Sequence, residues 1–200
     1  MLGHMGEAAQ SIRMTPDEYL AFERAAEQKH EYADGKIFAM SGGTREHSLI
    51  AGNILAELHG ALLERPCEVH GSDLRIKVVA TKRYFYPDVS VVCGNPRFED
   101  DTRDSLENPR VIVEVLSYST ERYDRGEKFA HYRTIDSLQD YVLASQAEPL
   151  IEHYQRRPDG TWVYRALGPG ERLVLASLDC EVLVDRAYLK VFEDRLVSGN

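Results

Sequence analysis

The sequence predicts a single α/β domain of the mixed α+β kind, with a central β-sheet of mixed strand directions flanked by helices. Three observations lead to this fold class. The run Val111–Leu116 is apolar except for one carboxylate, which is typical of a strand buried on both faces. Apolar residues recur at helical spacing from Thr44 to about Glu64, and from Cys67 onward the apolar period changes to two. Because no low-complexity linker separates these segments, we expect one domain rather than two.

Length and charge limit the class of protein. The 200 residues are enough to bury a proper core. We interpret residues 1–14 as a flexible N-terminus or an artificial remnant, since Met5 offers a second start, and residues 15–200 as the domain. The formal net charge of -9 argues against a general polyanion binder, because the long-range field repels nucleic acid. It leaves room for an enzyme with a local basic groove.

We expect a cytoplasmic protein without a membrane partner. No apolar stretch approaches the roughly 18 residues needed to span a bilayer, and no signal peptide is visible. Cys67, Cys93 and Cys180 are odd in number and far apart. They therefore indicate reduced, structural thiols.

The N-terminal third predicts a helix followed by a hairpin. Thr15 is a suitable N-cap and Glu18 completes a capping box, so a helix starts at about residue 16 and ends near Lys29. The segment 31–40 reads as a β-hairpin whose two-residue turn is Asp34-Gly35. The long helix from Thr44 comes next.

The middle third predicts strands. Segments 67–70 and 73–78 alternate between apolar and polar residues, and segment 84–93 is a further strand region with Pro87 at a joint. Segment 97–107 is rich in acids and poor in apolar residues, so we expect a solvated loop.

The C-terminal part predicts a helix, a strand and further hairpins. The Asp124…Glu127 spacing resembles a capping box, which favours a helix over about 125–135 with a possible start at Ser119 or Thr120. The remaining expected elements are strand 140–144, a hairpin of 150–155 with 161–166, strands 173–175 and 180–183, and a short helix over 185–189.

Glu114 is the residue that local structure explains least. Alternation places Ile112, Glu114 and Leu116 on one face of a buried strand. Burying an ionised carboxylate there costs on the order of several kcal/mol unless it is paired or binds a metal. Glu114 is therefore either the partner of a buried base or part of a functional site.

Asp88 offers a second carboxylate. It follows Pro87 and leads into the apolar strand Val89–Val92, so it either caps a turn or converges with Glu114 on a divalent cation. Mg²⁺ prefers one or two carboxylates together with water and phosphate oxygens, and the backbone carbonyl of Val115 is placed to add a ligand. Such an ion lowers the pKa of bound water and neutralises charge that develops on a phosphodiester.

Lys128 is expected on the helix that follows Glu114. A lysine there either orients an attacking water and stabilises the transition state or is an ordinary exposed residue. Arg125, Lys128 and Tyr132 lie at i, i+3 and i+7, which places them on one helix face. His47 and His131 are interpreted as surface or packing residues rather than ligands.

Several of these segments together resemble a known family, the Uma2-like (DUF820) endonucleases of the PD-(D/E)XK superfamily. The resemblance covers roughly residues 15–144 and rests on Tyr86–Val89, Val113–Ser117, Ser119-Thr120 and Asp124–Tyr132, with support from Glu31–Lys36 and Gly71–Arg75. One departure from the superfamily pattern is that Leu116, not a lysine, stands two residues after Glu114. The family resemblance implies that Lys128 supplies this lysine.

The resemblance implies a restriction-endonuclease-like core with added N- and C-terminal hairpins, and an endonuclease that uses Mg²⁺ (or Mn²⁺) to hydrolyse phosphodiester bonds of DNA. It also implies a homodimer. The residues and the resemblance together predict a site with catalytic residues and metal ligands: Asp88, Glu114 and Lys128 as catalytic, and Asp88, Glu114, Val115 and Glu31 as metal ligands. An acidic chain that cuts nucleic acid needs a local basic track, so Arg75 and Lys77, with Arg125 and Tyr132 on the helix face of Lys128, are predicted to contact the nucleic acid; otherwise these bases form a solvated strand edge and helix face.

Two other functions stay open at this point. The acidic charge and the displaced lysine also fit a catalytically inactive nuclease-fold module that binds nucleic acid or protein. A metal-dependent hydrolase of a small phosphorylated substrate is the third possibility.

Overall fold

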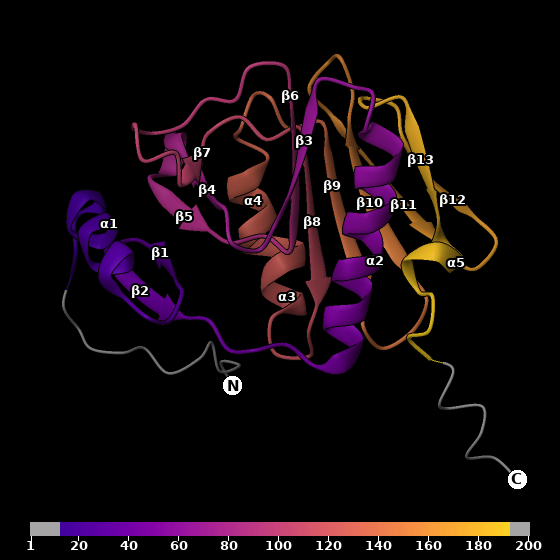
Figure 1. Ribbon diagram of the computed structural model, residues 1–200, viewed down its shortest axis with the longest axis horizontal. Coiled ribbons are helices and arrows are strands. Elements are labelled where there is room, and N and C mark those ends of the chain that lie inside the picture. Colours follow the sequence, from indigo (N-terminus) through magenta and orange to yellow (C-terminus); the bar gives the residue numbers. More distant parts are fainter. Residues whose placement is uncertain (1–12, 193–200) are drawn as a thin grey trace, which may run out of the picture.

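The computed structural model describes residues 13–192, so most of the segment 1–14 lies outside the described residues. Two sheets of unequal size lie side by side, with helices packed around them (Figure 1). The predicted mixed α+β class is confirmed. The N-terminal elements are α1 (Pro16–Ala25), β1 (His30–Ala33), β2 (Lys36–Ala39) and α2 (Arg45–Leu62).

The N-terminal predictions hold closely. Thr15 caps α1 and forms the capping box with Glu18, although the helix ends at Ala25 rather than near Lys29. The hairpin turns at Asp34-Gly35, where both residues have a positive φ, of 52° and 82°. Asn, Asp and Gly tolerate that left-handed backbone best, which explains why this dipeptide makes the turn.

The larger sheet has six strands in the order β11-β10-β9-β8-β6-β3. β8 pairs parallel with β9 and antiparallel with β6, so the sheet is mixed as predicted. All six residues of β8 are buried, as expected for a strand covered on both faces. The strands are β3 (Cys67–Gly71), β6 (Val89–Cys93), β8 (Val111–Leu116), β9 (Asp140–Ser145), β10 (Ile151–Arg156) and β11 (Trp162–Leu167).

The second sheet has five strands in the order β2-β1-β5-β4-β7. Its remaining members are β4 (Arg75–Val78), β5 (Arg83–Phe85) and β7 (Ser105–Leu106). The expectation of a solvated loop over 97–107 is wrong here, because β7 pairs parallel with β4 and Leu106 is fully buried. Asp100, Asp104 and Glu99 of this segment pair with Arg24, Arg75 and Lys77, so its acidic composition did not reveal these contacts with the rest of the fold.

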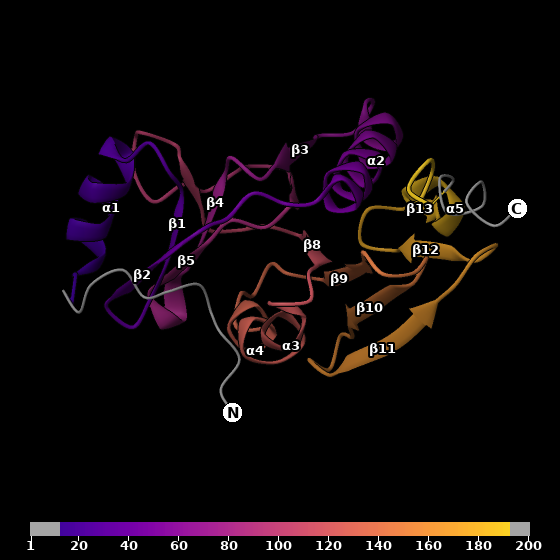
Figure 2. The same cartoon turned by 90° about the horizontal axis from the view of Figure 1, so that it is seen from below.

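The six-stranded sheet carries a separate core on each face. One core packs α2 against Val111, Val113 and Val115, and the other packs the helical segment after β8 against Ile112 and Leu116. Figure 2 shows α2 on one side of β8 and β9 and the helices α3 and α4 on the other. That helical segment consists of α3 (Glu121–Tyr123), the π-helical turn η2 (Asp124–Lys128) and α4 (Phe129–Tyr132).

The C-terminal elements complete the core on the α2 side. They are the two-stranded sheet β12 (Arg172–Leu175) and β13 (Cys180–Leu183), followed by α5 (Val184–Ala187). A 3₁₀ turn, η1 (Val79–Thr81), links β4 to β5. No helix within residues 13–192 has the length and apolar character needed to cross a bilayer.

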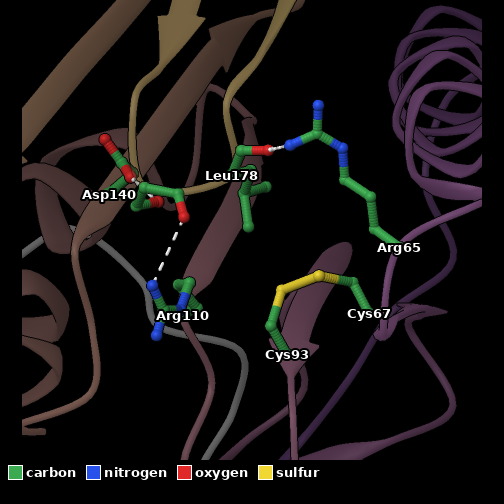
Figure 3. Close-up of a disulfide and its surroundings, with 7 residues drawn as sticks. Arg65, Cys67, Cys93, Arg110, Asp140 and Leu178 are labelled. Carbon is green, nitrogen blue, oxygen red and sulfur yellow. Dashed lines mark hydrogen bonds between the residues drawn. A yellow bond between two sulfur atoms is a disulfide. The ribbon is translucent and has the colours of Figure 1, made fainter.

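Cys67 and Cys93 form a disulfide between β3 and β6 (Figure 3). The prediction of reduced thiols is therefore wrong for this pair, while Cys180 is a free thiol. The two cysteines stand directly opposite each other in the antiparallel register of the strands. Their separation of 26 residues in the sequence gave no sign of that register.

Candidate active site

Two carboxylates meet at one end of the six-stranded sheet. β6 and β8 pair with Val89 opposite Val113, so extending the register by one residue places Asp88 opposite Glu114. The Val115 amide donates to Asp88 Oδ2 over 2.7 Å, which ties Asp88 to the neighbouring strand. Since directly opposite residues have their Cβ atoms roughly 4.5–5.5 Å apart, this register directs both side chains to the same place.

Glu114 is held on the sheet face that carries Ile112 and Leu116, as alternation predicts. It is only 5% exposed. Its Oε1 accepts a hydrogen bond from the Tyr132 hydroxyl over 3.0 Å and lies 2.8 Å from the Nζ of Lys128. The buried carboxylate is therefore paired, and its base comes from the next helical segment.

Lys128 reaches the site from η2. Its Nζ lies 3.0 Å from Glu31 Oε1 and 3.8 Å from Asp124 Oδ1, although the residue is only 5% exposed. Asp124, Lys128 and Tyr132 follow one another at intervals of four residues. The wide turn of a π-helix keeps such residues on one side, which directs all three toward the sheet.

Glu31 joins the site from the hairpin strand β1. Besides Lys128, its Oε1 accepts the amide of Tyr86 over 3.3 Å. Glu31 lines the same pocket as Asp88 and Glu114, as predicted. A role as metal ligand stays a prediction.

His47, which the sequence analysis interprets as a surface or packing residue rather than a ligand, lies at the site. From the first turn of α2, its Nε2 lies 2.8 Å from Asp88 Oδ1. This hydrogen bond raises the pKa of His47 above its usual value. The sequence offers one sign that His47 lies near a site. His47 follows the helix cap Thr44 by three residues, and the Gly42-Gly43 loop precedes that cap.

These side chains line one pocket of about 710 Å³. It lies at the end of β8, where the first turn of α2 and the loop into α3 come together (Figure 1). Four carboxylates line it, and we call them the acid cluster: Glu31, Asp88, Glu114 and Asp124. Its basic lining residues are Lys29, His47 and Lys128.

The acid cluster has more carboxylates than basic partners. Burial raises the pKa of Glu114 well above its usual value, and the other three carboxylates add to this shift against the opposing effect of Lys128. Burial also raises the pKa of Asp124. Burial opposes the charge on Lys128, but Glu114 and Glu31 outweigh it and raise the pKa of the ammonium well above its usual value. With one buried ammonium among four carboxylates, the cluster disfavours the charged forms of Glu114 and Asp124.

The donor set fits a hard divalent cation. Among residues 13–192, no three His, Cys, Asp or Glu side chains form a ready-made metal cluster. Mg²⁺ needs less than that, because it usually keeps several waters and is bound through one or two carboxylates plus substrate phosphates. The carboxylates of Asp88 and Glu114 and the carbonyl of Val115 are oxygen donors of the required kind.

Arg75 and Lys77, predicted to contact nucleic acid, lie elsewhere. Arg75 is 3% exposed and forms an ion pair with Asp104 at 2.5 Å. The Lys77 ammonium lies 2.9 Å from Glu99 and 3.2 Å from Glu107. Neither base lines the pocket. Contact of Arg75 or Lys77 with a substrate stays a prediction, and their pairing with acids does not support it.

Arg125 and Tyr132, the other two predicted contacts of nucleic acid, lie apart from each other. The guanidinium of Arg125 pairs with Glu121 and Glu152, both at 2.7 Å, rather than with the acid cluster. Tyr132 is fully buried and contacts Glu114 instead of the pocket surface. The expected common face of Arg125 and Lys128 is lost because η2 is π-helical, which changes the angle between residues three apart.

Comparisons with known proteins identify relatives of the whole domain. A family model described as "Uma2: Putative restriction endonuclease" matches residues 16–184. Two proteins of Synechocystis sp. are similar: "Uncharacterized protein slr1290" is 40% identical over 188 residues, covering 94% of this chain and 97% of the relative. "Uncharacterized protein sll1609" is 36% identical over 154 residues, covering 77% of this chain and 87% of that relative.

A solved structure shares the fold. It is the crystal structure of "a putative nuclease belonging to DUF820" from Anabaena variabilis, with a TM-score of 0.72 and 17% identity. The match covers 89% of this chain and 99% of that one. At this identity the likeness concerns the fold.

Proposed function

The chain belongs to the Uma2 family, and we propose that it is a metal-dependent endonuclease that hydrolyses phosphodiester bonds of DNA. The family description and the fold of the Anabaena protein support a nuclease. The observation that carries the finer proposal is the contact of the Lys128 ammonium with Glu114 at 2.8 Å and Glu31 at 3.0 Å, beside Asp88. Two acids from adjacent strands can hold a metal ion that activates water, and a lysine can stabilise the charge that develops on a phosphodiester.

Asp88, Glu114 and the Val115 carbonyl would hold Mg²⁺ (or Mn²⁺), with Glu31 as a further carboxylate. The bound ion supplies a water of lowered pKa and neutralises charge on the phosphate. Asp88 accepts a hydrogen bond from the Val115 amide and Glu114 accepts one from the Tyr132 hydroxyl, so each carboxylate is held at one oxygen by a neighbouring element of the fold. Such fixed donors cost no reorganisation during the reaction.

Lys128 would donate a hydrogen bond to a phosphate oxygen or to the attacking water. Its ammonium stays charged, because Glu114 and Glu31 raise its pKa. Lys29, at the pocket mouth, is only partly buried and pairs with the exposed carboxylate of Asp73. That surface ion pair is weak, so Lys29 is available to a phosphate of the substrate.

A plasmid-nicking assay tests the function. Supercoiled DNA should be nicked with Mg²⁺ or Mn²⁺ and stay intact with excess chelator. Asp88→Asn and Glu114→Gln should lose nicking together with metal affinity in isothermal titration. Glu107→Gln changes a carboxylate paired with Lys77 outside the pocket and is the matched control. Nicking that persists in folded Asp88→Asn protein would contradict the proposal.

The pairing of Arg75 and Lys77 with acids favours a second candidate, a hydrolase of a small phosphodiester. These pairs leave little free positive charge with which to bind an extended DNA backbone. Turnover of a small chromogenic phosphodiester by the wild type, lost in Glu114→Gln, with plasmid left intact, would favour this function over DNA cleavage.

A further inference from the structure

His47 and Asp88 form a contact between two layers of the fold. His47 extends from the first turn of α2, and Asp88 stands at the entry to β6. Their side chains are both largely shielded, with 22% and 16% exposed, and His47 Nε2 lies 2.8 Å from Asp88 Oδ1. The contact therefore links the helix on one side of the sheet to the carboxylate proposed to bind metal.

The two oxygens of Asp88 have different partners. Oδ2 accepts the Val115 amide, whose position is set by β8, while Oδ1 meets His47. A carboxylate with one oxygen bound can still rotate, but binding at both oxygens fixes its plane. Each carboxylate oxygen can accept about two hydrogen bonds or ligands, so each retains capacity for a cation.

The chain leaves room for the His47 ring. A Cβ atom on Gly43 would lie 2.9 Å from His47 Cδ2 and 3.0 Å from its Cγ, whereas a Cβ on Gly42 would meet nothing within 4 Å. The backbone of His47 is anchored separately, because its amide donates to the Thr44 hydroxyl over 3.1 Å. Only a residue without a side chain at position 43 allows His47 its observed rotamer.

We propose that His47 is a positioning residue that orients the Asp88 carboxylate for a divalent cation, and that Gly43 is required for this role. The inference rests on the proposed function in one respect, namely that Asp88 is a metal ligand. Hydrogen-bond partners of metal ligands fix ligand orientation, and losing one typically costs about 10–100-fold in metal affinity or activity. His47 acts on the cation through Asp88 and does not touch it.

The first test measures Mn²⁺ and Mg²⁺ binding by isothermal titration at fixed pH, without DNA. His47→Ala should weaken binding about 10–100-fold. His47→Gln, whose amide can donate to Asp88 in place of Nε2, should recover most of the affinity. Both variants should be checked for folding by their melting temperatures. Equal metal affinity in His47→Ala and wild type, or equally weak binding in His47→Gln and His47→Ala, would overturn the inference.

The second test moves the ring without removing it. Gly43→Ala should weaken metal binding as His47→Ala does, and should add nothing further in the His47→Ala background, because both changes remove the same contact. Gly42→Ala is the matched control and should bind metal as the wild type does. A Gly43→Ala protein with unchanged affinity would show that the space at position 43 is not needed.

The results also separate this inference from the proposed function. A wild type that binds neither ion overturns both. A wild type that binds the ions and whose His47→Ala variant binds them equally well overturns only the role of His47. A wild type that binds the ions with the expected loss in His47→Ala, but cleaves no DNA, supports the role of His47 and contradicts the proposed function.

Discussion

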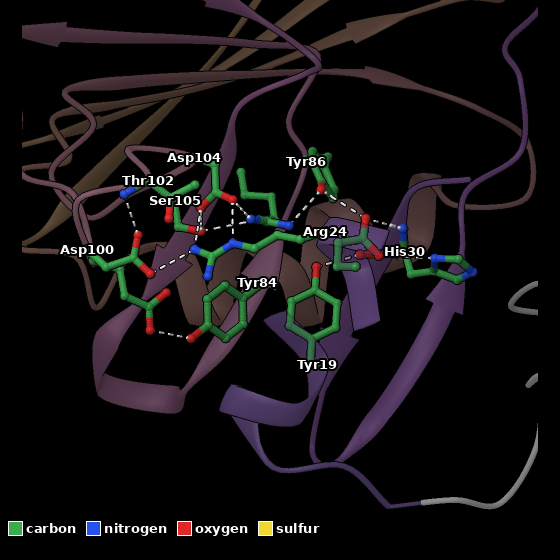
Figure 4. A network of polar contacts seen from close by, with 12 residues as sticks. Tyr19, Arg24, His30, Tyr84, Tyr86, Asp100, Thr102, Asp104 and Ser105 are labelled. Atoms are coloured by element: carbon green, nitrogen blue, oxygen red, sulfur yellow. Dashed lines mark hydrogen bonds and ion pairs between the residues drawn. The ribbon is translucent and has the colours of Figure 1, made fainter. Parts of the chain in front are cut away.

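Two groups of carboxylates in this protein are in opposite electrostatic conditions. The arginine network consists of Arg24, Arg75, Asp100 and Asp104, and its guanidinium groups pair with the carboxylates. Figure 4 shows the contacts of Arg24 with Asp100 and Asp104. In the acid cluster, the carboxylates outnumber the buried ammonium of Lys128.

The pKa values show the difference. Hydrogen bonds from Arg24 and Arg75 outweigh the burial of Asp104 and hold its pKa well below the usual value. Burial, with neighbouring carboxylates, raises the pKa of Glu114 and of Asp124. The fold thus favours the charged form of a carboxylate in one region and disfavours it in the other. Buried ionisable groups with shifted pKa values beside a pocket are characteristic of functional sites.

The largest expected effect is on catalysis in the acid cluster. Lys128→Ala should lower the plasmid-nicking rate about 10²–10³-fold, because it removes a donor aimed at charge that develops in the transition state. Mg²⁺ affinity should stay nearly intact, since the carboxylates remain. The exposed Lys36 on β2 gives the matched control, and Lys36→Ala should nick at the wild-type rate. Unchanged nicking by folded Lys128→Ala protein would remove Lys128 from the mechanism.

The next effect is on stability in the arginine network. Asp104→Asn should lower the free energy of unfolding by about 2 kcal/mol at pH 7, below the 3–5 kcal/mol of fully buried pairs because Asp104 is partly exposed. Its lowered pKa means that the stabilisation is present above the usual value of about 3.9 and is lost as pH falls through the lowered pKa.

Chemical denaturation across that pH range measures this difference. The gap between wild type and Asp104→Asn should close as the solution becomes acidic. Asp101→Asn, at an exposed neighbouring position, should change stability by less than about 0.5 kcal/mol. A gap that widens at low pH would mean that Asp104 is not stabilised as its charged form.

The smallest expected effect is a gain in stability, caused by a substitution in the acid cluster. With metal chelated, Asp124→Asn should raise the free energy of unfolding at pH 7 by about 1 kcal/mol, because it removes the cost of burying a charge and, to a smaller extent, repulsion by Glu31 and Asp88, at a cost to function. The pKa of Asp124 is raised by folding. The folded wild type is therefore stabilised most when Asp124 is protonated, and this stabilisation is lost as pH rises through the raised pKa. A destabilised Asp124→Asn protein at pH 7 would indicate that the cluster is balanced.

Local sequence patterns predicted the part of the site that lies on strands. The alternation around Glu114 predicted the sheet face on which this residue lies, and the apolar run after Asp88 predicted the neighbouring strand β6. A charge inside an apolar strand is a local signal, because its cost does not depend on distant contacts. The capping box at Thr15 and the Asp34-Gly35 turn were predictable for the same reason.

Residues whose place depends on how elements pack were not predictable. His47 enters the site because the first turn of α2 contacts Asp88 at the entry to β6, and Asp124 enters because η2 packs its buried side against the site. Arg75 looked like an exposed base on an alternating strand, but its guanidinium is buried against Asp104. The Cys67–Cys93 pair likewise depends on strand register. Each case needs contacts between segments that are distant in the sequence.

The central claim is that a divalent cation relieves the excess charge of the acid cluster, and carboxyl-detected NMR titration tests it most directly. In metal-free protein, Glu114 and Asp124 should titrate above their usual values and Asp104 below its own. Saturating Mg²⁺ should lower the pKa of Glu114 and Asp124 and leave that of Asp104 unchanged. If Mg²⁺ leaves the titration of Glu114 and Asp124 unchanged, the claim is contradicted, because a cation bound at Asp88 and Glu114 must favour their charged forms.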